Sequence, residues 1–306
     1  MKASYFERHG GPEVLAYGDR PDPVAGPGEI LVDIVAASVN GADWKVRFGG
    51  YHRLTTLPHI LGRDFSGTVA AVGAGVTDFK IGDEVFAVLP AGQEGTYAEK
   101  VAVKADVVAK KPAGLSHMNA AALALIGLTA MNSVEDTLKL KKGETILIQG
   151  GAGGVAGFAI QLAKHIGARV ISTTSAANVD YVRSLGADQV IDYNAKDFTG
   201  IGQVCDAVFD TVGSVAQKSY AVLKPGGRAA FIASGAQAPK PERSDVQRLR
   251  PPVPRGRKPL ERIAELFAAG AIHAPEVKIY RLQDAADAHR LSEARHFRGK
   301  LMFQVR

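Results

Sequence analysis

A glycine-rich segment between an apolar strand and an amphipathic helix places the strongest constraint on this fold. Residues 145–149 are mostly apolar and β-branched, and residues 155–166 repeat apolar side chains at helical spacing. The turn between them matches the pattern G-x-G-x-x-G/A at three positions: Gly151, Gly153 and Ala156. Such a turn brings backbone N–H groups close to a pyrophosphate at the start of a helix. We therefore predict a dinucleotide site here; the alternative is a strand-to-helix turn that binds no ligand.

The chain changes character near Ser116, which is a candidate N-cap of a helix. Before it, short β-branched segments alternate with Gly and Pro, which predicts a small barrel or an irregular β-domain. From Thr145 onward strands and helices alternate, which predicts an α/β fold with a parallel sheet covered on both faces. The expected strands are 145–149, 169–173, 189–191, 206–209, 228–232 and 300–305. The expected helices are 155–166, 179–185, 259–267 and 284–294.

Length and composition exclude several classes of protein. A chain of 306 residues suggests two domains, and 46% hydrophobic with 22% charged residues is ordinary for a globular protein. The single cysteine, Cys205, cannot form an internal disulfide. Neither a secretory signal nor a stretch long enough to span a membrane is visible, so we expect a cytoplasmic protein without a membrane partner.

The positive charge is concentrated in one segment. Residues 236–258 contain seven basic residues against two acidic ones, which accounts for five of the six net positive charges of the chain. Five prolines in the same stretch disfavour a helix or a central strand. We expect a solvated surface loop. Binding of single-stranded nucleic acid is an alternative, but the loop lacks the aromatic residues that stack on bases.

The second strand of the alternating region suggests which dinucleotide is bound. An NAD site usually places Asp or Glu at the end of this strand to hold the ribose 2′-OH. Here the strand ends in hydroxyls and is followed by Ser175 and Asn178, which leaves room for a 2′-phosphate. We therefore predict NADP(H), with Arg183 or an arginine of the basic segment as the candidate partner of that phosphate.

The residue types that would hold zinc are missing from the expected positions. A structural zinc site needs several cysteines, and a catalytic one needs Cys or His ligands at suitable spacing. Cys205 is the only cysteine, and the eight histidines show no ligand spacing. We predict neither a catalytic nor a structural zinc.

Further motifs extend this pattern along nearly the whole chain. Ser38-Val-Asn-Gly-Ala-Asp43 is similar to a V-N-x-x-D element, and residues 57–67 are similar to an L-P-x-x-L-G-x-D-x-x-G element. Shorter matches follow in order at 49–51, 75–85, 127–130, 161–164, 185–188, 190–193, 224–227 and 298–300. Together they resemble the zinc-independent quinone oxidoreductase, or zeta-crystallin-like, branch of the medium-chain dehydrogenase/reductase superfamily. Two features depart from that pattern: Ala156 replaces a usual glycine, and no lysine stands near Asn178.

The resemblance implies a GroES-like β-barrel catalytic domain and a Rossmann domain with a doubly wound parallel sheet. The first would cover residues 1–120 and be completed by 259–306; the second would cover 121–258. The resemblance assigns the substrate side to Asn40, Asp43 and Tyr51. It assigns cofactor binding to Thr129, Ala152, Gly153, Gly154, Val155, Ser175, Asn178, Tyr193, Val212, Gly213, Ala233 and Ser234.

The activity implied by the resemblance is hydride transfer from NADPH to a quinone or another α,β-unsaturated carbonyl. Asn40 or Tyr51 could hydrogen-bond a developing oxyanion, whereas Asp43 is also expected to act structurally by pairing with Lys45 or Arg63. Alternatives are an alkenal or enoyl-thioester reductase, or a non-catalytic NADPH sensor. Relatives are often homodimers or homotetramers, and a strand at 228–233 could pair across a two-fold axis. The alternative is that it is an ordinary edge or interior strand.

Overall fold

The computed structural model describes residues 1–50, 55–233, 237–252 and 255–306. These form two compact units. Unit 1 comprises Met1–Leu125, Arg255–Ala268 and Ala274–Arg306, and unit 2 comprises Ile126–Pro254 and Ala269–His273. The boundaries expected from sequence differ from these at 121–125, 255–258 and 269–273.

Unit 2 contains, in the described part of the chain, a six-stranded parallel sheet in the order β11-β10-β9-β12-β13-β14. Counted from β9 this is the order 3-2-1-4-5-6 of dinucleotide-binding folds, whose ligand lies where the order reverses, between the first and fourth strands. The strands are β9 (Thr145–Gln149), β10 (Arg169–Thr174), β11 (Gln189–Asp192), β12 (Cys205–Asp210), β13 (Leu223–Phe231) and β14 (Gln247–Leu249).

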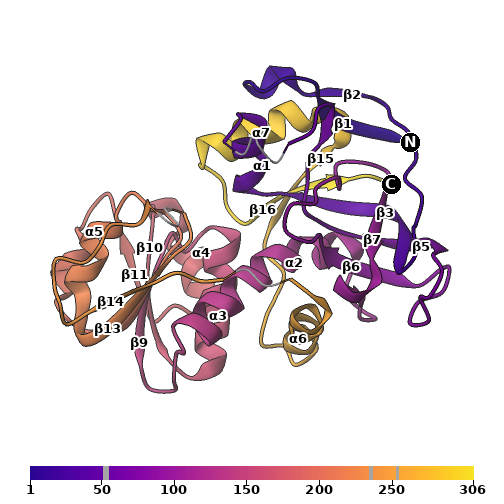
Figure 1. Cartoon of the computed structure of the whole chain (residues 1–306). Helices are drawn as coiled ribbons and strands as arrows, with labels where there is room; N and C mark the ends of the chain where they lie inside the picture. Colours follow the sequence, from indigo (N-terminus) through magenta and orange to yellow (C-terminus); the bar gives the residue numbers. More distant parts are fainter. Residues whose placement is uncertain (51–54, 234–236, 253–254) are drawn as a thin grey trace. The chain divides into compact units, whose positions relative to one another are not determined.

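Helices cover both faces of this sheet (Figure 1). Ser172 of β10 faces the α3 and α4 side, where it lies beneath Gly151 and Val182. Ile171 therefore faces the other side, where it packs with Ala216 of α5 and Tyr220 of η7. The helical elements are α2 (His117–Met131), the π-helical η4 (Asn132–Thr137), α3 (Gly154–Ile166), η5 (Ala176–Asn178), α4 (Val179–Ser184), η6 (Phe198–Ile201), α5 (Ala216–Ser219) and η7 (Tyr220–Val222).

Unit 1 is built on a sheet in the order β15-β16-β3-β5-β6-β8, with β7 paired to β3, and a smaller sheet in the order β2-β1-β4. Its strands are β1 (Lys2–Phe6), β2 (Ala16–Asp19), β3 (Glu29–Val39), β4 (His59–Ile60), β5 (Asp64–Val72), β6 (Glu84–Val88), β7 (Lys100–Lys104), β8 (Val108–Lys110), β15 (Val277–Arg281) and β16 (Lys300–Gln304). Its helices are η1 (Pro12–Val14), α1 (Gly41–Arg47), η3 (Ala105–Val107), α6 (Arg257–Ala268), η9 (Leu282–Asp284) and α7 (Ala285–Ala294). The C-terminal β16 pairs antiparallel with β3, so the two ends of the chain build one sheet.

Most expected elements are present within a few residues, and Ser116 caps α2 by accepting the amide of Asn119 at 3.2 Å. The strand near 228–233 is the interior strand that was the alternative to pairing across a two-fold axis. It is β13, which pairs with β12 on one side and β14 on the other. Because β14 covers Arg228, Ala229 and Ala230 on the side away from β12, this part of β13 has no free edge for pairing across a two-fold axis. No helix among the described residues is long and apolar enough to cross a membrane.

The basic segment is more firmly attached to the fold than a solvated loop. Arg243 pairs with Asp245 at 2.7 Å and donates to the carbonyl of Leu223. The other attached arginines donate to backbone carbonyls of their own unit: Arg248 to Ala238, Arg255 to Leu89, and Arg257 to Val108 and Ala105. Much of the excess positive charge therefore serves intramolecular contacts.

Candidate functional site

The glycine-rich turn lies where the strand order of unit 2 reverses, between β9 and β12. Gly150, directly after β9, has φ of 77°, a conformation that favours glycine. A Cβ on Gly150 would lie 2.8 Å from Cγ2 of Val212 and 3.0 Å from Oγ1 of Thr211, both of which follow β12. The turn thus needs glycine here for conformation and for the close approach of two strand ends.

The next glycines bring α3 against the sheet. A Cβ on Gly151 would lie 2.4 Å from Oγ of Ser172 and 2.9 Å from Cγ1 of Val182. Ala156 is buried, and a Cβ on Gly157 would meet Leu185 at 3.2 Å. The small residues of the sequence pattern therefore allow close packing of helix and strand.

The start of α3 presents backbone donors that no described residue engages. Gly153 is the N-cap residue and supplies no side-chain cap. Among the described residues, no hydrogen bond engages the amide groups of Ala152, Gly154 or Val155. These amides, together with the positive end of the helix dipole, form an anion-binding arrangement that fits a pyrophosphate. Four of the residues that were assigned to the cofactor from sequence, Ala152 to Val155, therefore form the start of this helix and the turn before it.

The carboxyl ends of β10 and β11 bring together the residues expected at the adenosine side. The side-chain amide of Asn178 donates to Oγ of Ser175 at 3.1 Å, and the backbone amide of exposed Tyr193 donates to the carbonyl of Thr174 at 3.1 Å. Asp192, at the end of β11, is the carboxylate of this edge that sequence reasoning missed; it accepts the amide of Asn194.

The guanidinium expected to meet a 2′-phosphate has a partner of its own. Arg183 lies on α4 and pairs with Asp180 at 3.3 Å, and both side chains are largely exposed. A pair of this kind is worth little in water, so it does not hold Arg183 firmly.

Asp210 shapes the turn after β12. Its Oδ1 accepts the amides of Val212 at 2.7 Å and Gly213 at 2.8 Å, so these two predicted residues are fixed by one carboxylate. Its Oδ2 is buried and has no hydrogen-bond partner among the described residues, and burial raises the pKa of Asp210. The Nε2 of Gln149, in register with Asp210 on β9, is likewise buried without a described partner.

The remaining predicted cofactor residues lie apart in sequence. Thr129 is half-buried on α2, and its carbonyl accepts the hydroxyl of Ser133 at 2.7 Å. Ala233 follows β13. Ser234 lies outside the described residues.

Unit 1 contains a buried polar network around Asn40. Its side-chain amide donates to Oδ1 of Asp64 at 2.8 Å and to Oγ of Ser38 at 3.3 Å. Its carbonyl oxygen accepts from Nζ of Lys300 at 2.5 Å, and Lys300 also donates to the carbonyl of Val39. Each polar atom of the Asn40 side chain is therefore engaged by the protein.

Asp43 ends a directed chain of hydrogen bonds. Its Oδ2 accepts the backbone amide of Asn40 at 2.8 Å, which caps α1, and the hydroxyl of Tyr97 at 2.8 Å. Nε2 of His289 lies 3.2 Å from that hydroxyl, and Nδ1 of His289 lies 2.9 Å from Nη1 of Arg47. Because Arg47 can only donate, the imidazole accepts at Nδ1 and donates at Nε2 to the Tyr97 oxygen.

A second set of charges surrounds Asp43. Arg63 places Nε 3.4 Å from Oδ1 of Asp43 and Nη2 2.7 Å from Glu94. Glu94 also accepts from, or pairs with, Nε2 of His59 at 2.8 Å. The predicted partner of Asp43 is thus Arg63 rather than Lys45.

Burial dominates the electrostatics of this network. It raises the pKa of Asp43 to about 7 although Arg63 opposes the shift, and it raises the pKa of Asp64 although Lys300 opposes the shift. It lowers the pKa of Lys300, and it lowers the pKa of His289 to about 3, with Arg47 adding to the effect. His289 is therefore neutral at physiological pH, as its hydrogen bonds require.

These contacts define what the substrate-side residues can do. Asp43 is fully buried and caps α1, so the geometry favours its structural role. Asn40 would have to break a hydrogen bond to Asp64 or Ser38 before its amide could reach a substrate oxygen. Tyr51 lies outside the described residues. Sequence reasoning missed Lys300, Tyr97 and His289 as parts of this network, because nothing in their local pattern links them to Asn40.

In the part of the chain that the structure describes, no group of three or more His, Cys, Asp or Glu side chains is arranged to hold a metal ion. Cys205, the one cysteine, is buried at the start of β12, and burial raises the pKa of its thiol to about 12.

Comparisons with known proteins agree with this architecture. The alcohol dehydrogenase GroES-like domain family matches residues 26–113, and the zinc-binding dehydrogenase family matches residues 185–302. The structure of the quinone oxidoreductase from Coxiella burnetii superposes with a TM-score of 0.94 at 35% identity, covering 100% of this chain and 99% of that one. The Escherichia coli quinone oxidoreductase complexed with NADPH gives a TM-score of 0.90 at 30% identity, with both chains fully covered.

A curated plant relative is similar over a shorter span. The 2-methylene-furan-3-one reductase of Solanum lycopersicum is 37% identical over 249 residues, which are 78% of this chain. The matched region covers 63% of the length of the tomato protein.

The GroES-like and dehydrogenase family matches, together with a Rossmann sheet that carries a glycine-rich turn where its strand order reverses, define a medium-chain dehydrogenase/reductase. The chain belongs to the quinone oxidoreductase branch of that superfamily of oxidoreductases.

Proposed function

We propose that the protein is a zinc-independent, NADPH-dependent reductase of quinones or other α,β-unsaturated carbonyl compounds. The observation that carries this proposal is the pair of features at the carboxyl edge of the unit 2 sheet. No described residue engages the amides of Ala152, Gly154 and Val155 at the start of α3, and β10 is followed by the hydroxyl and amide of Ser175 and Asn178 rather than by a carboxylate. The relatives support the same class, because two are quinone oxidoreductases, one of them complexed with NADPH.

The residues of unit 2 would bind and orient the cofactor. The amides of Ala152, Gly154 and Val155 would hold the pyrophosphate, and Ser175, Asn178 and Tyr193 would face the adenosine ribose and its phosphate. Thr129, Val212, Gly213, Ala233 and Ser234 are proposed for the remainder of the cofactor. When bound, NADPH supplies a hydride from C4 of its nicotinamide.

The residues of unit 1 would serve the acceptor. Asn40 and Asp43 would act as positioning residues, because both are committed to the start of α1. Tyr51 would donate a hydrogen bond to the developing oxyanion. Since no metal is proposed to polarise a carbonyl, a conjugated acceptor fits best, because conjugation spreads the developing negative charge.

The acceptor distinguishes the candidate functions. We would follow NADPH oxidation at 340 nm with a simple quinone, an alkenal, an enone, an enoyl thioester and a saturated ketone, with NADH in parallel. We expect turnover of conjugated acceptors with NADPH and none of the saturated ketone. Turnover of the enoyl thioester in preference to the others would favour the thioester reductase. NADPH binding without turnover of any acceptor would contradict the enzyme and favour the sensor.

A further inference from the structure

A chain of four buried side chains connects α7 to the start of α1 in unit 1. Arg47 and Asp43 belong to α1, His289 belongs to α7, and Tyr97 comes from the segment between β6 and β7. Each of the four is fully buried. Figure 1 shows α1 and α7 side by side in this unit. Because polar groups at this depth pair within the protein, the contacts among these four side chains determine how they are arranged.

Arg47 gives this chain its direction. Its Nε donates to the carbonyl of Gly10 at 3.0 Å, and its Nη1 lies 2.9 Å from Nδ1 of His289. A guanidinium only donates, so His289 accepts at Nδ1 and carries its proton on Nε2. That proton points to the hydroxyl oxygen of Tyr97, 3.2 Å away. The Tyr97 proton is therefore left for Oδ2 of Asp43, at 2.8 Å.

The chain decides which oxygen of Asp43 takes up a proton. Oδ2 already accepts the Tyr97 hydroxyl and the backbone amide of Asn40, each at 2.8 Å. Oδ1 is buried and accepts no hydrogen bond from the described residues, although Nε of Arg63 lies 3.4 Å from it. A proton that neutralises Asp43 therefore binds Oδ1, while Oδ2 remains on the first turn of α1.

Ionised Asp43 holds the start of α1 more firmly than neutral Asp43 does. Hydrogen bonds to a charged acceptor are about twice as strong as those to a neutral one, and the Tyr97 hydroxyl and the Asn40 amide both donate to Oδ2. The Tyr97 hydroxyl in turn favours the ionised form, because it donates to it. Without that hydroxyl the balance moves toward neutral Asp43 and a more weakly held start of α1.

Burial works against the ionised form. It raises the pKa of Asp43 to about 7, while Arg63 lowers that pKa and Glu94 raises it. Lys300 and Arg255 are close enough for their own pKa values to respond to the charge of Asp43. The titratable or charged groups that face Asp43 are thus Arg63, Glu94, Tyr97, Lys300 and Arg255. Asp43 is balanced between its two states near neutral pH, where the loss of one donor changes which state prevails.

We propose that Tyr97 and His289 are positioning residues of the reductase, which keep Asp43 ionised with Oδ2 on the start of α1 and thereby orient Asn40. This inference rests on the proposed function, in which Asn40 serves the acceptor. Both side chains are fully buried, so they act through Asp43 rather than on the acceptor. The enzyme with ionised Asp43 is the active form.

Tyr97→Phe tests the hydroxyl alone, because it keeps the ring that packs edge-on against Phe303 at a centroid distance of 4.6 Å. The assay follows quinone reduction at saturating NADPH from pH 5 to pH 9. We expect the acidic limb of kcat/KM for the quinone to move up by about one pH unit, since a donor to the carboxylate is lost. Activity then falls about tenfold below pH 6 and stays near wild type at pH 9. NADPH affinity should stay within twofold, because the dinucleotide edge belongs to unit 2.

His289→Gln and His289→Glu form a matched pair that tests the direction of the chain. Glutamine offers an acceptor to Arg47 and a donor to Tyr97, whereas glutamate only accepts and draws the Tyr97 proton away from Asp43. We expect His289→Gln to keep the wild-type acidic limb and His289→Glu to move it upward. Carbon-13 NMR of labelled aspartate carboxyls, with Asp43→Asn to assign the signal, should show the same displacements without any acceptor present.

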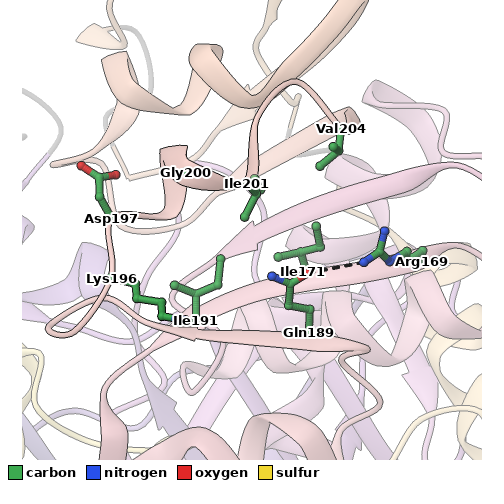
Figure 2. A pocket seen from close by; sticks show the side chains of 9 residues that line it. All are labelled: Arg169, Ile171, Gln189, Ile191, Lys196, Asp197, Gly200, Ile201 and Val204. Atoms are coloured by element: carbon green, nitrogen blue, oxygen red, sulfur yellow. Dashed lines mark hydrogen bonds between the residues drawn. The ribbon is translucent and has the colours of Figure 1, made fainter.

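Two variants of unit 2 serve as controls. Tyr220→Phe also removes a buried hydroxyl, which donates to the carbonyl of Pro239 at 2.7 Å. Gln189→Glu also places a carboxylate beside an arginine, because Gln189 accepts from Arg169 at 3.4 Å in a pocket of unit 2 (Figure 2). Both controls should keep the wild-type acidic limb. A limb that moves in the controls as far as in Tyr97→Phe would contradict the proposal.

The outcomes separate this inference from the function on which it rests. Absence of turnover in the wild type would contradict the proposed function and this inference with it. Wild-type turnover with an unmoved acidic limb in Tyr97→Phe would overturn this inference alone, as would equal limbs in His289→Gln and His289→Glu. Unfolding midpoints show which variants are folded at the assay temperature. If Tyr97→Phe does not fold, the His289 pair decides.

Discussion

Lys300 on β16 donates a hydrogen bond from Nζ to Oδ1 of Asn40, which precedes α1, at 2.5 Å. The two residues are 260 positions apart in the chain. This contact fixes the carbonyl of Asn40, while Asp64 and Ser38 fix its amide group. The C-terminal strand therefore determines the orientation of a residue that the family resemblance assigns to the substrate side.

Removing this buried charge should be strongly destabilising. Lys300→Met leaves the Asn40 carbonyl without its donor and leaves Asp64 buried without the nearby positive charge that opposes its pKa shift. Breaking a buried charged contact typically costs about 3–5 kcal/mol, and we expect a loss of that size in urea unfolding. Lys104→Met is the control, because the Lys104 side chain is exposed and its pair with half-buried Glu29 should contribute less than about 1 kcal/mol. Equal losses in the two variants would contradict this role of Lys300.

Asp43 should make stability depend on pH. Its pKa is raised from 3.8 to about 7 in the folded state, so the native protein holds the extra proton between these values. The contribution of this group to stability is complete below pH 4 and is lost as the pH rises through 7. Asp43→Asn cannot lose a proton, so the stability of wild type relative to this variant should fall by about 1–4 kcal/mol from pH 4 to pH 8.

The comparison of Asp43→Asn with wild type removes the contributions of other carboxylates, which both proteins share. Asp180→Asn is the control, because the Asp180 side chain is almost fully exposed. The stability of Asp180→Asn relative to wild type should stay constant from pH 4 to pH 8. Urea unfolding at each pH measures the difference, and a constant offset for Asp43→Asn would contradict the raised pKa.

The dinucleotide unit could be predicted from sequence because its signals are local. Glycines, a strand and a helix follow one another within about 20 residues, and the spacing of Gly151 and Ala156 reports helix–sheet packing directly. The network in unit 1 has no such signal. Tyr97 and His289 are 192 positions apart and meet only because α7 packs against β1, α1 and β16. The strand β14 could not be predicted either, because its three residues lie in a proline-rich segment and are too few to show an alternation of apolar and polar side chains.

Gly151 should tolerate no side chain. The Cβ of Gly151→Ala would lie 2.4 Å from Oγ of Ser172 and 2.9 Å from Val182, so α3 must move away from the sheet. We expect a loss of about 1–3 kcal/mol in stability and at least tenfold weaker NADPH binding, measured by fluorescence titration. In Gly200→Ala the added Cβ meets nothing within 4 Å, so both quantities should stay near wild type. Unchanged NADPH affinity in Gly151→Ala would show that the close packing is not required.

The basic segment should not bind nucleic acid strongly. Arg243, Arg248 and Arg257 are engaged by carbonyls or carboxylates of their own unit, so few cations remain for phosphates. We expect fluorescence anisotropy with a labelled single-stranded oligonucleotide to show weak binding and little change between 50 and 200 mM salt. Affinity that falls by orders of magnitude over that range would indicate many phosphate contacts and contradict this prediction.

Ser175 should control the choice between NADPH and NADH. It follows β10 at the position where NAD-binding folds carry a carboxylate for the ribose 2′-OH. In Ser175→Asp the new charge repels a 2′-phosphate and offers an acceptor to a 2′-OH, so we expect the ratio of kcat/KM for NADPH over NADH to fall at least tenfold. Ser184→Asp adds the same charge at the end of α4, away from the strand edge, and should leave the ratio within about twofold. A ratio that changes equally in both variants would point to a general electrostatic effect. A ratio that changes in neither would mean that Ser175 does not face the 2′ position.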